Sequence, residues 1–336
     1  FRLPISRAFA TDFATVAAAG TDGNFSGISG ISGARAPLIR SLRSLRSSFL
    51  APLASASPLA TPPRWAAPAS GRAEFTDIRR GVGAFTDRGG TIGYLKSDAA
   101  LVAVDTQFPE SAQIFLDGLR EGSDRRLDVL VNTHHHGDHT AGNAVLAPVA
   151  DLHVAHEAVS GLQRARAVGS DGYATQRYAD ETFRETWRAD LGDEVLALHY
   201  FGPAHTCGDA VVHFERADVV HMGDLVFNRR QPFIDRAGGA SVEAWGTLLE
   251  TVHGRFSDET VFVFGHAGDG FPVIGTRADL LTMRDFLAAA RRAIVPRAAD
   301  GATAVDIEGL LIPGFEDWGE TPIRVAEPII AEFAGG

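Results

Sequence analysis

The sequence contains little cysteine, little lysine and no long apolar run. Cys207 is the only cysteine among 336 residues, which excludes an internal disulfide and leaves the redox compartment open. Lys96 is the only lysine, so arginine supplies nearly all of the positive charge. No apolar run reaches the roughly 20 residues that a membrane-spanning helix requires. We therefore expect a protein without disulfides and without a contact to the membrane.

The charge is unevenly distributed along the chain. Residues 1–72 contain eight arginines and two aspartates, a net charge of +6, whereas the whole chain carries −11 and residues 73–336 therefore −17. Proteins that bind nucleic acids need clustered lysine and arginine for the phosphates. We therefore expect no nucleic-acid partner for residues 73–336 and instead a small-molecule substrate. The sequence leaves the oligomeric state open.

Residues 1–72 do not have the pattern of a folded domain. They are rich in alanine, serine, glycine, arginine and proline, and they lack sustained helical or strand periodicity. A basic stretch, residues 40–46, precedes a short apolar stretch that ends in Ala54-Ser55-Ala56, which could be a cleavage site. Two interpretations stay open, a disordered extension and an export signal. If residues 40–56 act as a signal, the protein is periplasmic or secreted, and otherwise it is cytoplasmic. In either case one folded domain is expected over residues 73–336.

A histidine-rich segment marks the centre of that domain. Residues 134–139 read His-His-His-Gly-Asp-His and directly follow an apolar run, residues 127–131. A strand that ends abruptly in a turn can spread its side chains around its tip. His134 and His136 can then converge on one cation while Asp138 and His139 face a second, and His135 should point away. Imidazole together with carboxylate is a ligand mixture that suits zinc.

Three further positions repeat one pattern, in which an apolar run leads to a small residue and then to a histidine or aspartate. His205 follows the run at residues 196–201, Asp224 follows residues 219–222, and His266 follows residues 261–264. Short apolar runs of this kind are typical of buried strands. If these strand ends meet at one edge of a layered sheet, their polar side chains build a single cluster.

The order and spacing of these residues resemble the metallo-β-lactamase fold superfamily of hydrolases over about residues 74–295. The resemblance implies an α/β fold, a four-layer αββα sandwich, with a dinuclear site between its two sheets. It implies two Zn²⁺ ions, with iron or manganese as alternatives. The implied ligands are His134, His136 and His205 for the first metal, Asp138, His139 and His266 for the second, and Asp224 for both or for the second. Asp105 would support the metal loop, residues 133–139.

A dinuclear centre of this kind predicts hydrolysis. Bound zinc lowers the pKa of water from about 15.7 towards about 7, so a metal-bound hydroxide can attack an activated acyl bond. Asp138 is the expected catalytic residue, because it could orient the hydroxide and accept its proton. No serine or cysteine nucleophile is required.

The substrate class stays open. A cyclic amide or ester, meaning a β-lactam or a lactone, is favoured first, with Asn228 as an oxyanion donor and Arg229 or Arg230 as the cation for a substrate carboxylate. A thioester, as in hydroxyacylglutathione hydrolase, is the second alternative, although residues 297–336 contain only two basic residues. A phosphodiester ranks third. A di-iron redox enzyme on the same fold is the alternative from another class.

The remaining pattern predicts the elements around the site. Strands are expected within residues 75–85, 91–95 and 100–104, and helices at 110–121, 242–252 and 279–294. The polar stretch 164–187 is expected to form helices or a lid. Cys207 is interpreted as a packing residue and Asp209 as a support of the loop that carries His205.

Overall fold

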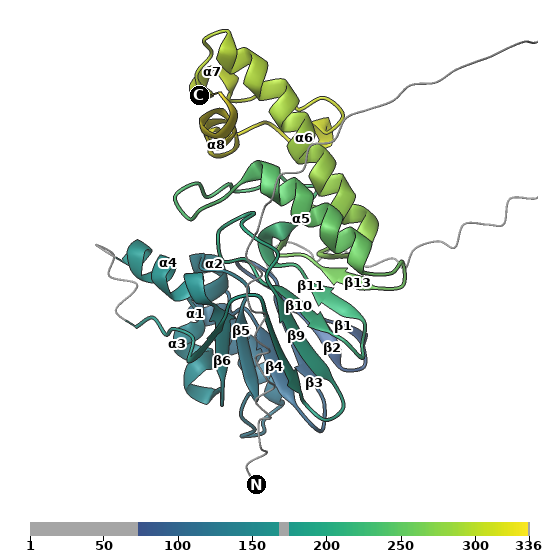
Figure 1. Ribbon diagram of the computed structural model, residues 1–336. Helices are drawn as coiled ribbons and strands as arrows, with labels where there is room; N and C mark the ends of the chain where they lie inside the picture. The colour runs from purple at the N-terminus through teal and green to yellow at the C-terminus, as the bar shows by residue number, and fades with distance from the viewer. Residues whose placement is uncertain (1–72, 168–174, 335–336) are drawn as a thin grey trace, which may run out of the picture. The chain divides into compact units, whose positions relative to one another are not determined.

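Two β-sheets lie face to face and carry helices on their outer faces (Figure 1). Alternation of side chains along the strands produces these layers. In the strand Leu101–Val104, Val102 and Val104 pack between the two sheets, whereas Leu101 and Ala103 pack against helices on the outer side. Both faces of the strand are therefore buried, which explains its continuous apolar run.

The computed structural model describes residues 73–167 and 175–334, all of which belong to one compact unit, Arg64–Gly336. The expected extension or signal at residues 1–72 lies outside the described residues. Among the described helices, none is both long and apolar enough to cross a membrane.

The first sheet has seven strands in the order β1 to β7, namely β1 (Glu74–Arg79), β2 (Val82–Thr86), β3 (Ile92–Lys96), β4 (Leu101–Val104), β5 (Val129–Asn132), β6 (His153–His156) and β7 (Glu181–Phe183). The second has the order β15-β13-β11-β10-β9-β8, with β8 (Thr186–Asp190), β9 (Val195–His199), β10 (Val211–Phe214), β11 (Val219–His221), β13 (Val261–Val263) and β15 (Ile274–Gly275). A two-stranded ladder pairs β12 (Phe227–Asn228) with β14 (His266–Ala267).

The strand directions bring particular loops together. Strands β4 and β5 are parallel, and so are β11 and β13. Strand β10 is antiparallel to both β9 and β11, so β9, β11 and β13 point the same way. The loops that follow β9, β11 and β13 therefore leave the second sheet at one edge.

The helices are α1 (Pro109–Arg120), α2 (Gly137–Thr140), α3 (Asn143–Leu146), α4 (Glu157–Ala167), α5 (Val242–Arg255), α6 (Arg277–Ala299), α7 (Ala304–Ile307) and α8 (Ile323–Phe333). Helices α1 and α3 cover the outer face of the first sheet, where Phe115 and Leu119 pack against Leu130. Helices α5 and α6 cover the outer face of the second sheet, where Trp245 packs against Val220. The expected four-layer αββα sandwich is confirmed.

The C-terminal segment adds a small helical layer that the sequence did not reveal. Helices α7 and α8 pack against α6 in the upper part of Figure 1. Phe286 of α6 stacks on Trp318, with ring centroids 4.5 Å apart, and Val325 and Ile329 of α8 are fully buried. The region after Gly301 is therefore anchored to the same core as the second sheet.

Most expected elements are confirmed, with one correction. The helices predicted at 110–121, 242–252 and 279–294 correspond to α1, α5 and α6. The prediction of helices or a lid over residues 164–187 was wrong in its second half, which contains β7 and the start of β8. Residues 168–174 of that stretch lie outside the described residues. These strands lie at the edges of the two sheets. In β8 every second side chain is exposed. Because these exposed residues are polar, the sequence pattern did not identify the segment as a strand.

Candidate metal centre

The polar residues predicted at the strand ends meet in one place. His134 and His136 follow β5, and Asp138 and His139 lie in α2. The other three residues come from the loop after β9, from the turn Gly223–Leu225 and from β14, and they are His205, Asp224 and His266. Asp138 and His266, 128 positions apart in the sequence, thus lie within 3.1 Å of each other.

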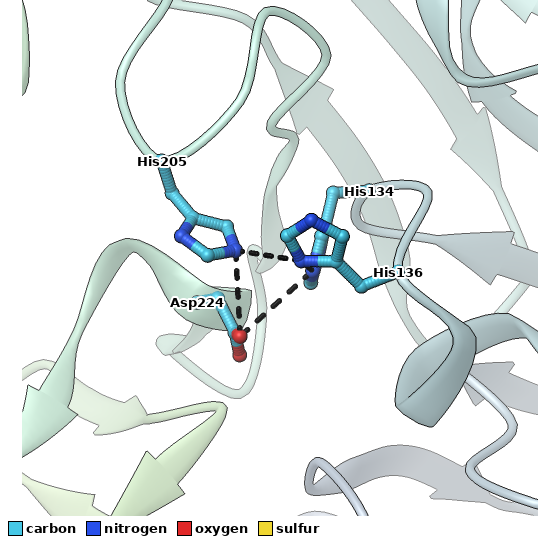
Figure 2. A group of neighbouring side chains, drawn as sticks. All are labelled: His134, His136, His205 and Asp224. Carbon is cyan, nitrogen blue, oxygen red and sulfur yellow. Dashed lines mark hydrogen bonds and ion pairs between the residues drawn. The ribbon is translucent and has the colours of Figure 1, made fainter. Parts of the chain in front are cut away.

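Three imidazoles and one carboxylate form the first cluster, which Figure 2 shows converging on a common point. Nδ1 of His136 lies 3.0 Å from Nε2 of His134 and 2.9 Å from Nε2 of His205. Oδ2 of Asp224 lies 3.5 Å from Nε2 of His205 and 3.8 Å from Nε2 of His134. Bonds of about 2.0–2.1 Å to a tetrahedral zinc ion would place its ligand atoms about 3.3 Å apart, so this spacing fits such an ion.

The second cluster shares Asp224 with the first. Nε2 of His139 lies 3.0 Å from Oδ1 of Asp224 and 3.8 Å from Oδ2 of Asp138. Nε2 of His266 lies 3.1 Å from Oδ2 of Asp138 and 3.4 Å from Oδ2 of Asp224. Oδ1 of Asp224 is buried and accepts no hydrogen bond from any residue that the structure describes. A carboxylate in this position can serve two cations at once.

Hydrogen bonds on the far side of the imidazoles leave the inward nitrogens free to bind a metal. His205 donates from Nδ1 to the carbonyl of Phe233 over 2.8 Å, and Nδ1 of His139 lies 2.8 Å from Oδ2 of Asp105. The Thr133 hydroxyl donates to Asp105, so it can accept from Nδ1 of His134, 3.0 Å away. Partners of this kind fix the tautomer of a metal-binding histidine.

The electrostatics of the two clusters differ. Burial lowers the pKa of His134 and brings that of His205 to about 3, so both imidazoles are neutral, the form in which an imidazole can bind a metal ion. Burial also acts to lower the pKa of His139, but Asp224, Asp138 and Asp105 outweigh it and raise the pKa well above the usual value. Burial acts to raise the pKa of Asp224, yet His139 and His266 hold it well below its ordinary range. The second cluster thus attracts positive charge.

Two local features shape the centre. Asp105, directly after β4, adopts a left-handed backbone with φ of 68°, and its carboxylate accepts from both the backbone N–H and the hydroxyl of Thr133 at 2.7 Å. The predicted support of the metal loop by Asp105 is confirmed in this geometry. Gly265 precedes His266, and a Cβ atom there would collide with Oδ1 of Asp224, so no side chain fits at this close approach.

A cavity of about 240 Å³ opens onto both clusters. The side chains and backbone around it come from His136, Gly137, Asp138, Arg166, Asp224, Phe227, Arg230, Gln231, Phe233, His266 and Arg324. Arg230 and Arg324 form no hydrogen bond or ion pair with any described residue, and burial together with the charge of Arg230 lowers the pKa of Arg324. Two neighbouring guanidinium groups are thus free to meet an anion.

The expected substrate contacts lie elsewhere. Asn228 donates its side-chain amide to the carbonyl of Pro272 over 2.8 Å, and Arg229 points to Asp317, 3.3 Å away. Neither residue lines the cavity. Of the two arginines considered for a substrate carboxylate, only Arg230 lines the cavity.

Three residues at the centre carry no signal in the sequence pattern. Asp235 lies 2.9 Å from Nε2 of His136 and 2.6 Å from Arg166, and Arg324 reaches the cavity from α8. Asp235 follows no strand, and the two arginines, Arg166 and Arg324, occur in helices whose position over the site depends on packing.

His135, expected to point away from the centre, is buried with Nε2 3.2 Å from Asp235. Asp209 accepts from the N–H and hydroxyl of Thr206, and so supports the His205 loop as predicted.

Comparison with known families identifies the fold family. The model of the metallo-beta-lactamase superfamily matches residues 85–290, which is more than half of the chain. The chain belongs to this superfamily. The matched region contains both clusters and ends within α6, so it does not include α7 and α8.

Solved structures agree on the fold. A metallo-beta-lactamase from Pontibacter korlensis is 20% identical with a TM-score of 0.54, over 64% of this chain and 99% of that one. The DIM-1 metallo-beta-lactamase is 16% identical with a TM-score of 0.53, over 65% and 98%. A double mutant of the sec-alkyl sulfatase PisA1 is 14% identical with a TM-score of 0.58, over 78% of this chain and 50% of that one.

A curated relative is similar over a shorter stretch. The 2,4-dinitroanisole O-demethylase subunit alpha of Nocardioides sp. (strain JS1661) is 29% identical over 135 residues, which is 40% of this chain and 40% of that relative. The chain thus matches well under half of the relative's length. The superfamily includes hydrolases such as the β-lactamases and the sulfatase, and the clusters of this chain could hold metal ions.

Proposed function

We propose that the protein is a dinuclear metal-dependent hydrolase that cleaves a small anionic substrate at an activated acyl bond. The observation that carries the proposal is the pair of clusters beside one cavity, with Asp224 in the first cluster and also 3.0 Å from His139 and 3.4 Å from His266 of the second. In this proposal the first ion is held by His134, His136 and His205, and the second by Asp138, His139 and His266. Asp224 serves both.

Zinc suits this donor set best, with iron or manganese as alternatives. Five imidazoles and two carboxylates are borderline to hard ligands without thiolate, and Cys207 is absent from both clusters. The neutral tautomers of His134 and His205 match what a divalent cation requires. When bound, two such ions would act as Lewis acids and lower the pKa of water in the cavity.

Asp138 is positioned to handle the proton of the attacking water. Its side chain is about one third exposed and lines the cavity, and it also lies within hydrogen-bond distance of His266. A carboxylate there can accept a hydrogen bond from water, take its proton as the new C–O bond forms, and return the proton to the leaving nitrogen or oxygen. Its pKa is lowered by the charges of His139 and His266 against the effect of burial, so it is ionised and able to accept.

The walls of the cavity favour an anionic substrate of modest size. Phe227 and Phe233 supply apolar surface beside His266 and His136. Arg230 and Arg324 supply positive charge, and within residues 73–167 and 175–334 their side chains have no ion-pair partner. Guanidinium groups recognise carboxylates and similar oxyanions by paired hydrogen bonds. A cyclic amide or ester that carries a carboxylate meets these conditions, and so does a thioester with an anionic group.

Metal analysis combined with a substrate panel tests the proposal. The purified protein should contain two ions per chain and should turn over at least one β-lactam, lactone or thioester in a panel that also contains sulfate esters and phosphodiesters. Turnover of the sulfate esters or phosphodiesters alone would contradict the acyl-bond proposal. The sulfate ester enters the panel because of the likeness to the sec-alkyl sulfatase. Removal of the metal with a chelator should abolish turnover, and added zinc should restore it. A metal-free protein with unchanged turnover would exclude the proposal, and iron at both positions with redox activity would favour the di-iron alternative.

A further inference from the structure

A second carboxylate, Asp235, lies behind the first cluster and contacts three charged or polar side chains. Its Oδ2 is 2.9 Å from Nε2 of His136, 3.2 Å from Nε2 of His135 and 2.6 Å from Nη2 of Arg166. Only 4% of Asp235 is exposed. Its other oxygen accepts from the backbone N–H of Gly238 over 3.0 Å. Oδ2 of Asp235 thus contacts side chains around the first cluster, and Oδ1 binds a backbone N–H of its own loop.

The contact with Asp235 determines which nitrogen of His136 carries the proton. An ionised carboxylate can only accept, so the short contact to Oδ2 places the proton on Nε2. The lone pair then lies on Nδ1, the atom that faces His134 and His205. Arg166 offers the opposite arrangement, because its Nη2 lies 3.3 Å from Nε2 of His136 and can only donate. The carboxylate prevails, since its contact with Nε2 is the shorter of the two, 2.9 Å against 3.3 Å.

The same loop also orients His205. The carbonyl of Phe233, two residues before Asp235, accepts from Nδ1 of His205. One short segment therefore sets the tautomers of two imidazoles that face each other across the first cluster. The loop is held tightly at this point, since a Cβ atom at Gly238 would collide with Oδ2 of Asp235 and lie 2.9 Å from Cε1 of His135.

His135, His136 and Asp235 are close enough together to hold a cation of their own, but the contacts argue against that role. The guanidinium of Arg166 already occupies the open side of Oδ2 at 2.6 Å, so a metal ion there would meet a fixed positive charge. His136 would also have to bind one ion through each ring nitrogen.

We propose that Asp235 is a positioning residue for the first metal, which holds His136 with Nδ1 unprotonated against the competing donor Arg166. This inference rests on the ligand assignment of the proposed function. It predicts that loss of Asp235 leaves Arg166 as the neighbour of Nε2, so that the proton moves to Nδ1 and faces the metal position.

The test is a metal titration of the apoprotein, which needs no substrate. Apoprotein prepared with a chelator is titrated with Co²⁺ and with Zn²⁺, and binding is followed by calorimetry and by the visible spectrum of the cobalt form. The variant His134→Ala identifies the binding step that belongs to the first cluster. In Asp235→Ala that step should weaken about 10- to 100-fold, the usual effect of losing such a partner, while the second step stays unchanged.

The double variant separates tautomer control from packing. Adding Arg166→Ala to Asp235→Ala removes the donor that opposes the metal, so part of the lost affinity should return. Without recovery, Asp235 acts only through packing and the proposal is wrong. The matched control is Glu194→Gln, because Glu194 is another buried carboxylate, 1% exposed, whose partners Val195, Arg216 and Ala217 are remote from the centre. This control should leave both binding steps intact.

The outcomes separate this inference from the proposed function. A wild-type protein that binds fewer than two ions contradicts the proposed function itself. Two ions in the wild type with unaltered affinity in Asp235→Ala overturn only the role of Asp235. Three ions in the wild type, one of which is lost in Asp235→Ala, would make Asp235 a metal ligand and would also overturn it.

Discussion

Nδ1 of His139 lies 2.8 Å from Oδ2 of Asp105, and both side chains are completely buried. Asp105 binds Thr133 with the same carboxylate, so a single residue orients the start of the metal loop and the histidine six positions after it. The left-handed backbone of Asp105 is a conformation that non-glycine residues adopt rarely. Its presence next to the centre indicates that the position of this carboxylate matters more than local backbone energy.

The first prediction concerns that carboxylate. Asp105→Asn keeps the shape but removes the charge that orients Nδ1 of His139. We expect the affinity of the second cluster for zinc to fall about 10- to 100-fold, measured by competition with a chromophoric chelator. Unchanged affinity for both ions would show that Asp105 supports only the backbone.

The second prediction concerns the ligands of the first cluster. His134→Ala and His205→Ala should each reduce the metal content from two ions to one, because an alanine leaves at most two imidazoles around the first position. Activity should fall by several orders of magnitude with the loss of the ion. Elemental analysis of the dialysed variants checks the first statement and turnover checks the second. Retention of two tightly bound ions would contradict the ligand assignment.

The third prediction separates the two carboxylates of the centre. Asp138→Asn should keep at least the first ion and lose hydrolysis by a factor on the order of a hundred or more, because an amide cannot accept the proton. Asp224→Asn should mainly weaken metal binding, so excess zinc should restore part of its activity. Zinc should not restore Asp138→Asn. If both variants respond to zinc in the same way, their separate roles are incorrect.

The fourth prediction concerns the guanidinium pair. Arg230→Ala and Arg324→Ala should each raise KM for a carboxylated substrate about 10-fold, the loss of one hydrogen bond to a charged group, with a smaller effect on kcat. The methyl ester of that substrate should show no such change. Arg229→Ala is the matched control, because Arg229 faces Asp317 outside the cavity. An equal effect of all three variants would point to a general change of charge.

The fifth prediction concerns pH. Divalent ions bind neutral imidazoles, and the carboxylates around His139 and His266 raise the pKa of both groups, against the effect of burial. Protons therefore compete with the second ion from a higher pH than they do at an ordinary histidine. Burial lowers the pKa of His134 and of His205, so the first ion should remain bound to lower pH.

The measurement for this prediction is metal content after equilibration between pH 8 and pH 5. The second ion should leave first as the pH falls, and zinc uptake by the apoprotein in weak buffer should release protons. Loss of both ions at one pH would show that the two clusters do not differ in this way.

The sequence by itself determined the layers of the fold and the residues that meet at the candidate metal centre. Apolar runs such as residues 127–131 and 261–264 identify buried strands, and a small residue followed by histidine or aspartate identifies their ends. These signals are local, because the alternation of a strand and the turn after it depend on neighbouring residues. Residues 134–139, His205, Asp224 and His266 have the order and spacing of the superfamily, so the sequence alone identified the seven side chains.

The tertiary structure alone decided which nitrogen of each histidine faces inward at the centre and which residues surround the cavity. Asp235 and Arg324 lie 99 and 188 positions beyond His136 in the chain, and no pattern connects them. Strand β8 was missed because an edge strand exposes polar side chains on one face. Which nitrogen of a histidine faces inward depends on the partner of the other nitrogen, and packing of distant loops selects that partner. Arg324 reaches the cavity only because the apolar side of α8 is buried against α6.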